Sequence, residues 1–413
     1  MNDQNDQNDQ ILRLGDVEAE DGRFARFELI GWWDQQRLAE ARVVVIGAGA
    51  IGNELVKNLA LLGVGNLFIA DLDRIEHSNL SRSVLFRESD CGESKADVAA
   101  RGARELYPQM NTASFDGNIV HDLGLGIYRW ADVILGGLDN REARVAINSA
   151  AARTGKSWID GAIERLDGVA RVFDPATGPC YECTMSEIDW KMLDARRSCA
   201  LLTRDEMEEG KVPTTPTTAS VIAGIQAQEA VKLLHGLDVL TGQGFIFDGT
   251  HHQSYTVSYP RLEDCPAHEA YDPIEVLEES VATTTAGELL ERARSDLGPE
   301  AVIEVNSDLL ESLTCSACNV TQPMLASLGR VTESAGRCPD CDQPRTPNVY
   351  HTIGDRPELL ELLEKTLAEL GVPPWDIVGA RAGLESRYYE FAGDRGSVLG
   401  DLDDSPHQTS TAD

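Results

Sequence analysis

The sequence contains no run of about 20 apolar residues, which is the length that an α-helix needs to cross a bilayer. It is also poor in positive charge, with 36 lysines and arginines against 69 aspartates and glutamates and a formal net charge of −33. So acidic a chain is poorly suited to non-specific attraction to nucleic acid or to anionic membranes. The composition therefore argues against nucleic acid and membranes as partners.

The first ten residues, MNDQNDQNDQ, lack the basic and apolar stretches of a secretory signal. They form a short polar repeat typical of disordered segments, and we expect disordered tails at residues 1–20 and 397–413. Without a secretory signal, the protein is expected in the reducing cytoplasm. In that compartment, closely spaced cysteines indicate metal sites more often than disulfides.

Residues 43–71 hold a β-branched run, a glycine-rich turn, a helix and a second apolar strand. Gly47, Gly49 and Gly52 form a GxGxxG motif directly after the first strand. Glycine lets the backbone approach a phosphate, and the N-terminus of the following helix supplies N–H donors. Asp71 ends the second strand, where a carboxylate can bond a ribose hydroxyl. The pattern predicts a nucleotide-binding βαβ unit.

The alternation of strands and helices continues, and a strong helix (219–236) and two late strands follow. This order predicts a Rossmann-like, doubly wound α/β sheet over residues 21–272. The composition then becomes acidic and loop-rich, with helix patterns at 286–298 and 356–371. We expect a small, separate α+β domain over residues 273–396.

Polar and charged residues follow the strands of the predicted sheet: Asp73, Asn79, Arg82, Lys95 and Asp139. Arginine and lysine can brace a triphosphate, and an aspartate can hold Mg²⁺. These groups are not what a hydride-transfer enzyme needs, but they suit a protein that holds ATP for attack on its α-phosphate. We therefore interpret them as a site for ATP and magnesium.

Several strings occur in a specific order and spacing over about residues 20–270. They are RFAR (23–26), GAGAIG (47–52), GVGNLFIADLD (63–73), SNLSR (78–82), GESK (92–95), LDNREAR (138–144), PCYEC (179–183) and SVIAGIQAQEAVKLL (220–234). In these strings the chain resembles the ThiF/MoeB/HesA adenylyltransferases, which are relatives of the ubiquitin-activating enzymes. That family adenylates the C-terminal glycine of a ubiquitin-fold protein and releases pyrophosphate. Some members then capture the activated carbonyl on a cysteine.

The resemblance implies roles for single residues. Asp71 would bind the ribose, and Asp139 would hold magnesium. The phosphates would be contacted by Asn79, Arg82 and Lys95. Arg26 matches an arginine that the partner subunit donates across a homodimer. The implied partner is a small ubiquitin-fold carrier protein with a C-terminal Gly-Gly.

Cys199 is the candidate nucleophile for a thioester. It lies in an irregular polar segment, in the region where thioester-forming relatives carry their cysteine. Arg196, Arg197 and Arg204 are close in sequence, and cationic neighbours favour the thiolate. The alternative is a spare thiol, as in relatives that only adenylate.

Cys180 and Cys183 form a CxxC pair, which recurs in the family as half of a zinc site. The other half usually follows the last strand of the sheet. Cys265 and His268 occupy that place here and would complete a Cys₃His tetrahedron. With no open coordination position, the zinc would be structural.

A second set of cysteines has the spacing CxxC-x₁₉-CxxC, which is typical of a zinc ribbon. It consists of Cys315, Cys318, Cys338 and Cys341. A rubredoxin-like iron site uses similar ligands, and zinc is favoured because no redox partner residue is evident. The resemblance does not extend to this part of the chain, so the role of the C-terminal domain stays open.

Two other classes of protein share parts of this pattern. An NAD-dependent oxidoreductase would share the βαβ unit, but no catalytic histidine or Tyr-x-x-x-Lys motif lies near it. A non-catalytic, zinc-stapled binding scaffold would not need Arg82 or Asp139, and both are present. The sequence therefore favours an adenylyltransferase that uses ATP, magnesium and zinc.

Overall fold

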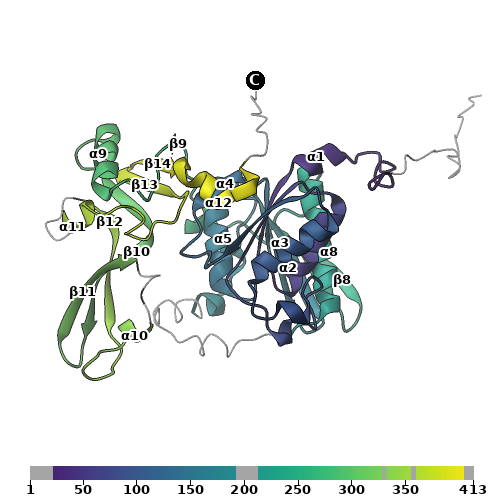
Figure 1. The fold of residues 1–413 in the computed structure, drawn as a ribbon, viewed down its shortest axis with the longest axis horizontal. Helices are drawn as coiled ribbons and strands as arrows, with labels where there is room; N and C mark the ends of the chain where they lie inside the picture. Colours follow the sequence, from purple (N-terminus) through teal and green to yellow (C-terminus); the bar gives the residue numbers. More distant parts are fainter. Residues whose placement is uncertain (1–21, 192–212, 328–330, 332, 355–359, 404–413) are drawn as a thin grey trace, which may run out of the picture.

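The computed structural model describes residues 22–191, 213–327, 331, 333–354 and 360–403 (Figure 1). Its first part is built on one eight-stranded sheet. The strands are β1 (Arg42–Ile46), β2 (Asn66–Asp71), β3 (Asn111–Asp116), β4 (Val133–Gly136), β5 (Trp158–Glu164), β6 (Asp167–Phe173), β7 (Gln243–Asp248) and β8 (Gln253–Ser258). They lie in the order β3-β2-β1-β4-β5-β6-β7-β8. The pairs from β3 to β5 are parallel, and those from β5 to β8 are antiparallel.

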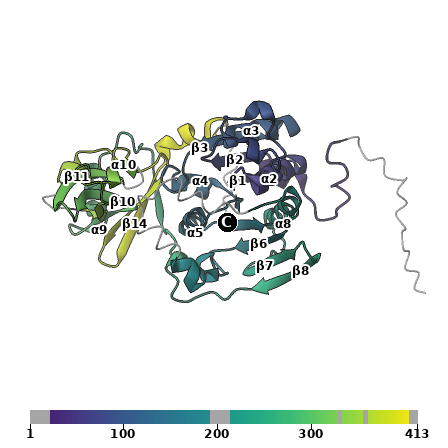
Figure 2. The same cartoon turned by 90° about the horizontal axis from the view of Figure 1, so that it is seen from below.

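Helices cover both faces of this sheet (Figure 2). On one face are α2 (Ala50–Leu62), α3 (Lys95–Leu106) and α8 (Pro216–Leu234), on the other are α4 (Leu125–Trp130) and α5 (Arg141–Thr154), and α1 (Gln35–Glu40) precedes β1. In β1, Val43 and Val45 join one apolar core while Val44 and Ile46 join the other. This burial on both faces explains the continuous β-branched run in the sequence. Among the described helices, none combines the length and apolar character of a bilayer-spanning segment.

A second sheet lies beside the first (Figure 1). Its strands are β9 (Ile274–Leu277), β10 (Val302–Cys315), β11 (Val320–Ser327), β12 (Thr346–Ile353), β13 (Ile377–Ala382) and β14 (Glu385–Phe391). The order is β11-β10-β13-β14-β9, and β12 pairs with β10. Helix α9 (Ala286–Leu297) packs against this sheet and closes a separate apolar core. Three short helices also follow in this part of the chain: α10 (Glu333–Gly336), α11 (Leu360–Leu363) and α12 (Arg395–Leu399).

The helix predicted over residues 356–371 is confirmed at α11 and is wrong for residues 364–371, which are not α-helical. The reason lies in the backbone hydrogen bonds of the following residues. Lys365 accepts the N–H of Ala286, and Leu367 donates its own N–H to Thr284. The start of α9 thus takes the groups that would have continued the helix, so a tertiary pairing overrides a good local helix pattern.

The second sheet is attached to the first through α4. The N–H of Leu125 donates to Asp376 Oδ1 at 2.8 Å, and the N–H of Gly126 donates to the carbonyl of Trp375 at 2.9 Å. The Trp375 side chain is buried in the same apolar core as the side chains of α4. The two sheets therefore share one core at this junction.

Residues at the C-terminal end of the described chain return to the first sheet. Leu399, in α12, and Leu402 are both buried in the core that contains α4. The turn at Gly400–Leu402 contacts β3, the outer strand of the first sheet. The first sheet thus receives part of its cover from residues that follow the second sheet.

We expect Gly126→Ala to destabilise the protein by about 1–3 kcal/mol. A Cβ at this position would lie 2.5 Å from the Trp375 ring, which is buried and has no room to move aside. Gly224→Ala is the matched control, because Gly224 is also inside a helix but has no atom within 4 Å of its Cβ position. Alanine there should stabilise by about 0.5–1 kcal/mol. Urea unfolding of both variants measures the difference, and equal effects would contradict the proposed clash.

Candidate functional site

The glycine turn between β1 and α2 is fixed by close backbone contacts. Gly47 has φ of +90°, and a Cβ there would lie 2.7 Å from the carbonyl oxygen of Gly137. A Cβ on Gly52 would lie 1.8 Å from the carbonyl oxygen of Gly47. Gly49, by contrast, has no atom within 4 Å of its Cβ position. The turn is therefore packed on its inner side and open at the helix N-terminus, where a phosphate can be bound.

Asp71 lies at the carboxyl end of β2 and is bonded to the glycine turn. Its Oδ2 accepts the N–H of Ala48 at 2.6 Å, and its Oδ1 accepts the N–H of Asp73 at 2.8 Å. Burial raises the pKa of Asp71 above its usual 3.8, although the nearby Lys95 ammonium and the two N–H groups oppose this shift. The carboxylate thus joins the ends of two neighbouring strands.

Lys95 is the first residue of α3, and Ser94 caps this helix. Lys95 is only 9% exposed, and its Nζ lies 2.7 Å from Asp73 Oδ2. The N–H of Lys95 also donates to the carbonyl of Asp73 at 3.0 Å. Asp73 therefore holds both the backbone and the ammonium of Lys95 beside the carboxyl end of β2.

Asn79 and Arg82 lie on the loop that follows β2. Asn79 is buried, and its Oδ1 accepts the N–H of Glu76 at 2.9 Å. Arg82 Nη1 donates to the carbonyl of Ser78 at 2.7 Å at the exposed surface of this loop. In the described structure, these hydrogen bonds stay within the loop and do not reach Asp71 or Lys95.

Asp139 follows β4, which is the neighbour of β1 on the side away from β2. Its side chain is exposed, and Asn140 beside it caps α5 by accepting the N–H of Ala143 at 2.8 Å. Because β2, β1 and β4 are adjacent and parallel, their carboxyl ends bring Asp71, the glycine turn and Asp139 to one edge of the sheet.

Two other predicted site residues are not part of this cluster. Arg26 lies in the turns before α1, and its side chain is exposed. Within the described ranges, it makes no ion pair. Cys199 lies outside the described residues.

A buried group that the sequence reasoning missed lies behind Asp139. Asp160, in β5, has no exposed surface and is bonded to the guanidinium groups of Arg144 and Arg171. Burial alone would raise the pKa of Asp160, but the two arginines lower it below its usual 3.8. The available signal was a single carboxylate inside the apolar strand WIDGA, which requires a buried cation.

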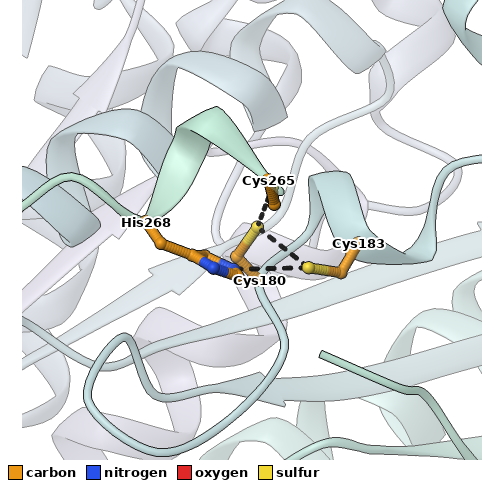
Figure 3. Close-up of side chains that lie close together, drawn as sticks. All are labelled: Cys180, Cys183, Cys265 and His268. Carbon is orange, nitrogen blue, oxygen red and sulfur yellow. Dashed lines mark hydrogen bonds between the residues drawn. The ribbon is translucent and has the colours of Figure 1, made fainter. Parts of the chain in front are cut away.

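Cys180, Cys183, Cys265 and His268 point toward one another (Figure 3). Cys180 Sγ lies 3.7 Å from Cys183 Sγ and 3.6 Å from Cys265 Sγ, and Cys183 Sγ lies 3.3 Å from His268 Nε2. Zn–S bonds of about 2.3 Å in a tetrahedron place two sulfurs about 3.8 Å apart. The donor set therefore fits a zinc ion. Asn148 of α5 holds this turn by accepting the N–H of Tyr181 at 2.9 Å.

The second set of cysteines lies at the end of β10 and in the turns around it. Cys315 Sγ is 3.6 Å from Cys341 Sγ, and Cys338 Sγ is 4.0 Å from Cys318 Sγ. The N–H of Cys318 donates to Cys315 Sγ at 3.4 Å and lowers the pKa of the Cys315 thiol to about 7. These four sulfurs also fit a tetrahedral metal, since all lie within 4.8 Å of one another.

Elemental analysis should find two zinc ions in each chain. Cys180→Ser and Cys315→Ser should each lose about one ion, because each change removes one of four ligands from a closed site. Cys91→Ser is the control, since Cys91 is a free thiol outside both sets and its loss should leave the zinc content unchanged. A wild type with one ion, or with iron in place of zinc, would show that one of the two sets is misread.

Comparison with known proteins connects this site to a family. The profile of the ThiF family matches residues 22–267. The sulfur carrier protein adenylyltransferase of Thermus thermophilus is 32% identical over 243 residues, which cover 57% of this chain and 85% of that protein. The SAMP-activating enzyme E1 of Haloferax volcanii is 34% identical over 250 residues, which cover 57% of this chain and 83% of that protein.

Solved structures agree at the level of the fold. Escherichia coli MccB, crystallised with ATP, has a TM-score of 0.51 and 22% identity, and the likeness covers 61% of this chain and 75% of that one. The second sheet, which starts at Ile274, follows the residues that match the family profile. Because that match covers more than half of the 413 residues, the chain belongs to the ThiF family.

Proposed function

We propose that this protein adenylates the C-terminal glycine of a small ubiquitin-fold or sulfur-carrier protein, using ATP and Mg²⁺. The observation that carries the proposal is the arrangement at the sheet edge. There the glycine turn, Asp71 and the Asp73–Lys95 pair are linked by direct contacts. The names of the relatives support the same activity, because they include adenylyltransferases and activating enzymes of carrier proteins.

In the proposed reaction, an oxygen of the carrier carboxylate attacks the α-phosphorus of ATP. The bond from this phosphorus to the oxygen bridging to the β-phosphate breaks, and pyrophosphate leaves with the electron pair. The product is a mixed anhydride of the carrier and AMP. This step needs alignment and charge neutralisation rather than a general base.

The residues of the site suit that need. Lys95 has three N–H donors, so one can stay on Asp73 while the others face the phosphates. Arg82, at the exposed surface of its loop, can turn toward the same phosphates, and Asp71 would accept a ribose hydroxyl. Asp139 would hold Mg²⁺, which would offset negative charge on the phosphates.

The zinc sites and the second sheet would have structural and binding roles. Zinc at Cys180 would tie the turn after β6 to the segment after β8. We further propose residues 21–272 as the adenylation domain and 273–396 as a second domain with a zinc ribbon. Transfer of the product to Cys199 stays a prediction from the sequence.

We expect carrier-dependent exchange of pyrophosphate into ATP. The assay uses ubiquitin-fold proteins ending in Gly-Gly from the same genome, tested one at a time. Asp139→Ala should slow exchange by about 10²–10³-fold, because it removes the carboxylate that would hold magnesium. Asp238→Ala is the control, since this exposed aspartate follows α8, and it should keep the wild-type rate. Wild-type exchange in Asp139→Ala would overturn the assignment.

Features of the N-terminal turns support a homodimer in which Arg26 acts on the partner's site. Arg26 is exposed, while Phe24 of the same segment packs against the end of α2. Leu29 and Trp32 of this segment are 61% and 47% exposed, which leaves apolar side chains near Arg26 for another protein surface to cover. A second copy of the chain would provide that surface.

Mixing Arg26→Ala subunits with Lys95→Ala subunits tests this arrangement. Each variant alone should be inactive. After subunit exchange, about half of the dimers are mixed, and each mixed dimer has one site with both residues intact. Exchange activity should therefore recover to about one quarter of the wild-type rate. No recovery after confirmed mixing would show that Arg26 acts within its own subunit.

A further inference from the structure

The buried ion triad of Arg144, Asp160 and Arg171 lies directly behind the proposed magnesium site. Arg144 Nε donates to Asp160 Oδ1 at 2.8 Å, and Arg171 Nε donates to Asp160 Oδ2 at 3.1 Å. The side chains of Arg144 and Arg171 are only 9% and 14% exposed, and Asp160 is fully buried. Burying three charged side chains costs desolvation free energy, so a contribution to folding stability does not by itself explain this triad.

Arg144 and Arg171 differ in the contacts that they make besides those with Asp160. Arg144 Nη2 donates to the carbonyl of Leu138, and also to the carbonyl of Gly161 at 3.2 Å. Leu138 directly precedes Asp139, so Arg144 fixes the peptide group that carries the proposed magnesium ligand. Arg171 instead donates to Thr184 Oγ1 at 3.2 Å and stacks over Tyr181, on the zinc side of the triad.

Among the described residues, the Asp139 carboxylate accepts one hydrogen bond, a long one of 3.4 Å from Asn140 Nδ2. The N–H of Gly137 donates to Ile46 at 2.8 Å, and the side chain of Asn140 caps α5. Between these two points, Arg144 makes the contact with the Leu138 carbonyl. Because that guanidinium is itself held by Asp160, the triad anchors the peptide group directly before Asp139.

We propose that Arg144 is a positioning residue for magnesium, and that Asp160 holds it in place for this role. The inference rests on the proposed adenylation. When Arg144 is lost, the Leu138 carbonyl loses this anchor, and the Asp139 carboxylate is held less firmly for the metal. ATP binding without metal does not depend on that carboxylate and is unaffected.

The test is equilibrium binding of ATP to the full-length protein, without any carrier, by titration calorimetry over a range of Mg²⁺ concentrations and in EDTA. Mg²⁺ should increase the affinity for ATP. Arg144→Gln should raise the Mg²⁺ concentration that gives half of this increase by about tenfold, the size expected from losing one hydrogen bond of a charged group. The affinity for ATP in EDTA should stay within about twofold of wild type.

Arg171→Gln is the matched control. Like Arg144→Gln, it leaves Asp160 with one guanidinium and removes one buried charge, but it keeps the contact with the Leu138 carbonyl. Its magnesium dependence should equal that of wild type. In an Asp139→Ala background, Arg144→Gln should add no further change. If a glutamine variant fails to fold, as judged by thermal unfolding, Arg144→Lys and Arg171→Lys replace the pair.

The outcomes separate this inference from the proposed function. The inference is overturned if both arginine variants shift the required Mg²⁺ concentration equally. It is also overturned if Arg144→Gln loses as much ATP affinity in EDTA as in Mg²⁺. Either result would make the triad merely structural. In that case, carrier-dependent exchange by the wild type would leave the proposed function standing. A wild type that binds no ATP with Mg²⁺ would remove both.

Discussion

Helix α2 can begin so soon after β1 only because three glycines, Gly47, Gly52 and Gly137, meet there without side chains. A Cβ on Gly52 would overlap the carbonyl oxygen of Gly47, and a Cβ on Gly137 would lie 2.9 Å from the N–H nitrogen of Gly52. This close approach brings the helix N-terminus to the carboxyl edge of the sheet, beside the ends of β2 and β4. The polar groups of the site are arranged around this helix N-terminus.

The buried cations near the site are each paired with a carboxylate, although the chain as a whole is strongly acidic. The protein carries a net charge of −33, yet the cations behind the sheet edge are each bonded to a carboxylate. Lys95 is held by Asp73, and Arg144 is held by Asp160. Such pairing fixes the direction of long side chains before any ligand arrives, which is the condition for electrostatic preorganisation.

The local parts of this arrangement could be predicted from the sequence. The strand β1, the helix α2 and Asp71 follow from a glycine motif and from apolar periodicity within about 30 residues. Each CxxC or CxxH pair is also a local signal, and the structure brings the two pairs of each set together. The match of Cys180 with Cys265, however, required the family resemblance, since 85 residues separate them.

For other features, the local sequence does not identify the partner. Asp160 lies 16 residues from Arg144 and 11 from Arg171, and ion pairs between neighbouring strands and helices leave no periodic trace in the sequence. The segment after α11 has a helical pattern, but its backbone bonds to the start of α9 instead. In both cases a long-range partner decides the local structure, and a single sequence does not reveal that partner.

The position of β9 has a consequence for synthesis of the protein on the ribosome. β9 is the first strand of the second sheet in the sequence, yet it pairs in parallel with β14, the last one. All strands of the first sheet have been made by Ser258, so that sheet can assemble while the chain is still growing. β9 must wait, with its edge unpaired, for more than 100 further residues to be added. During that interval the nascent chain would be open to chaperones or to pairing with the wrong strand.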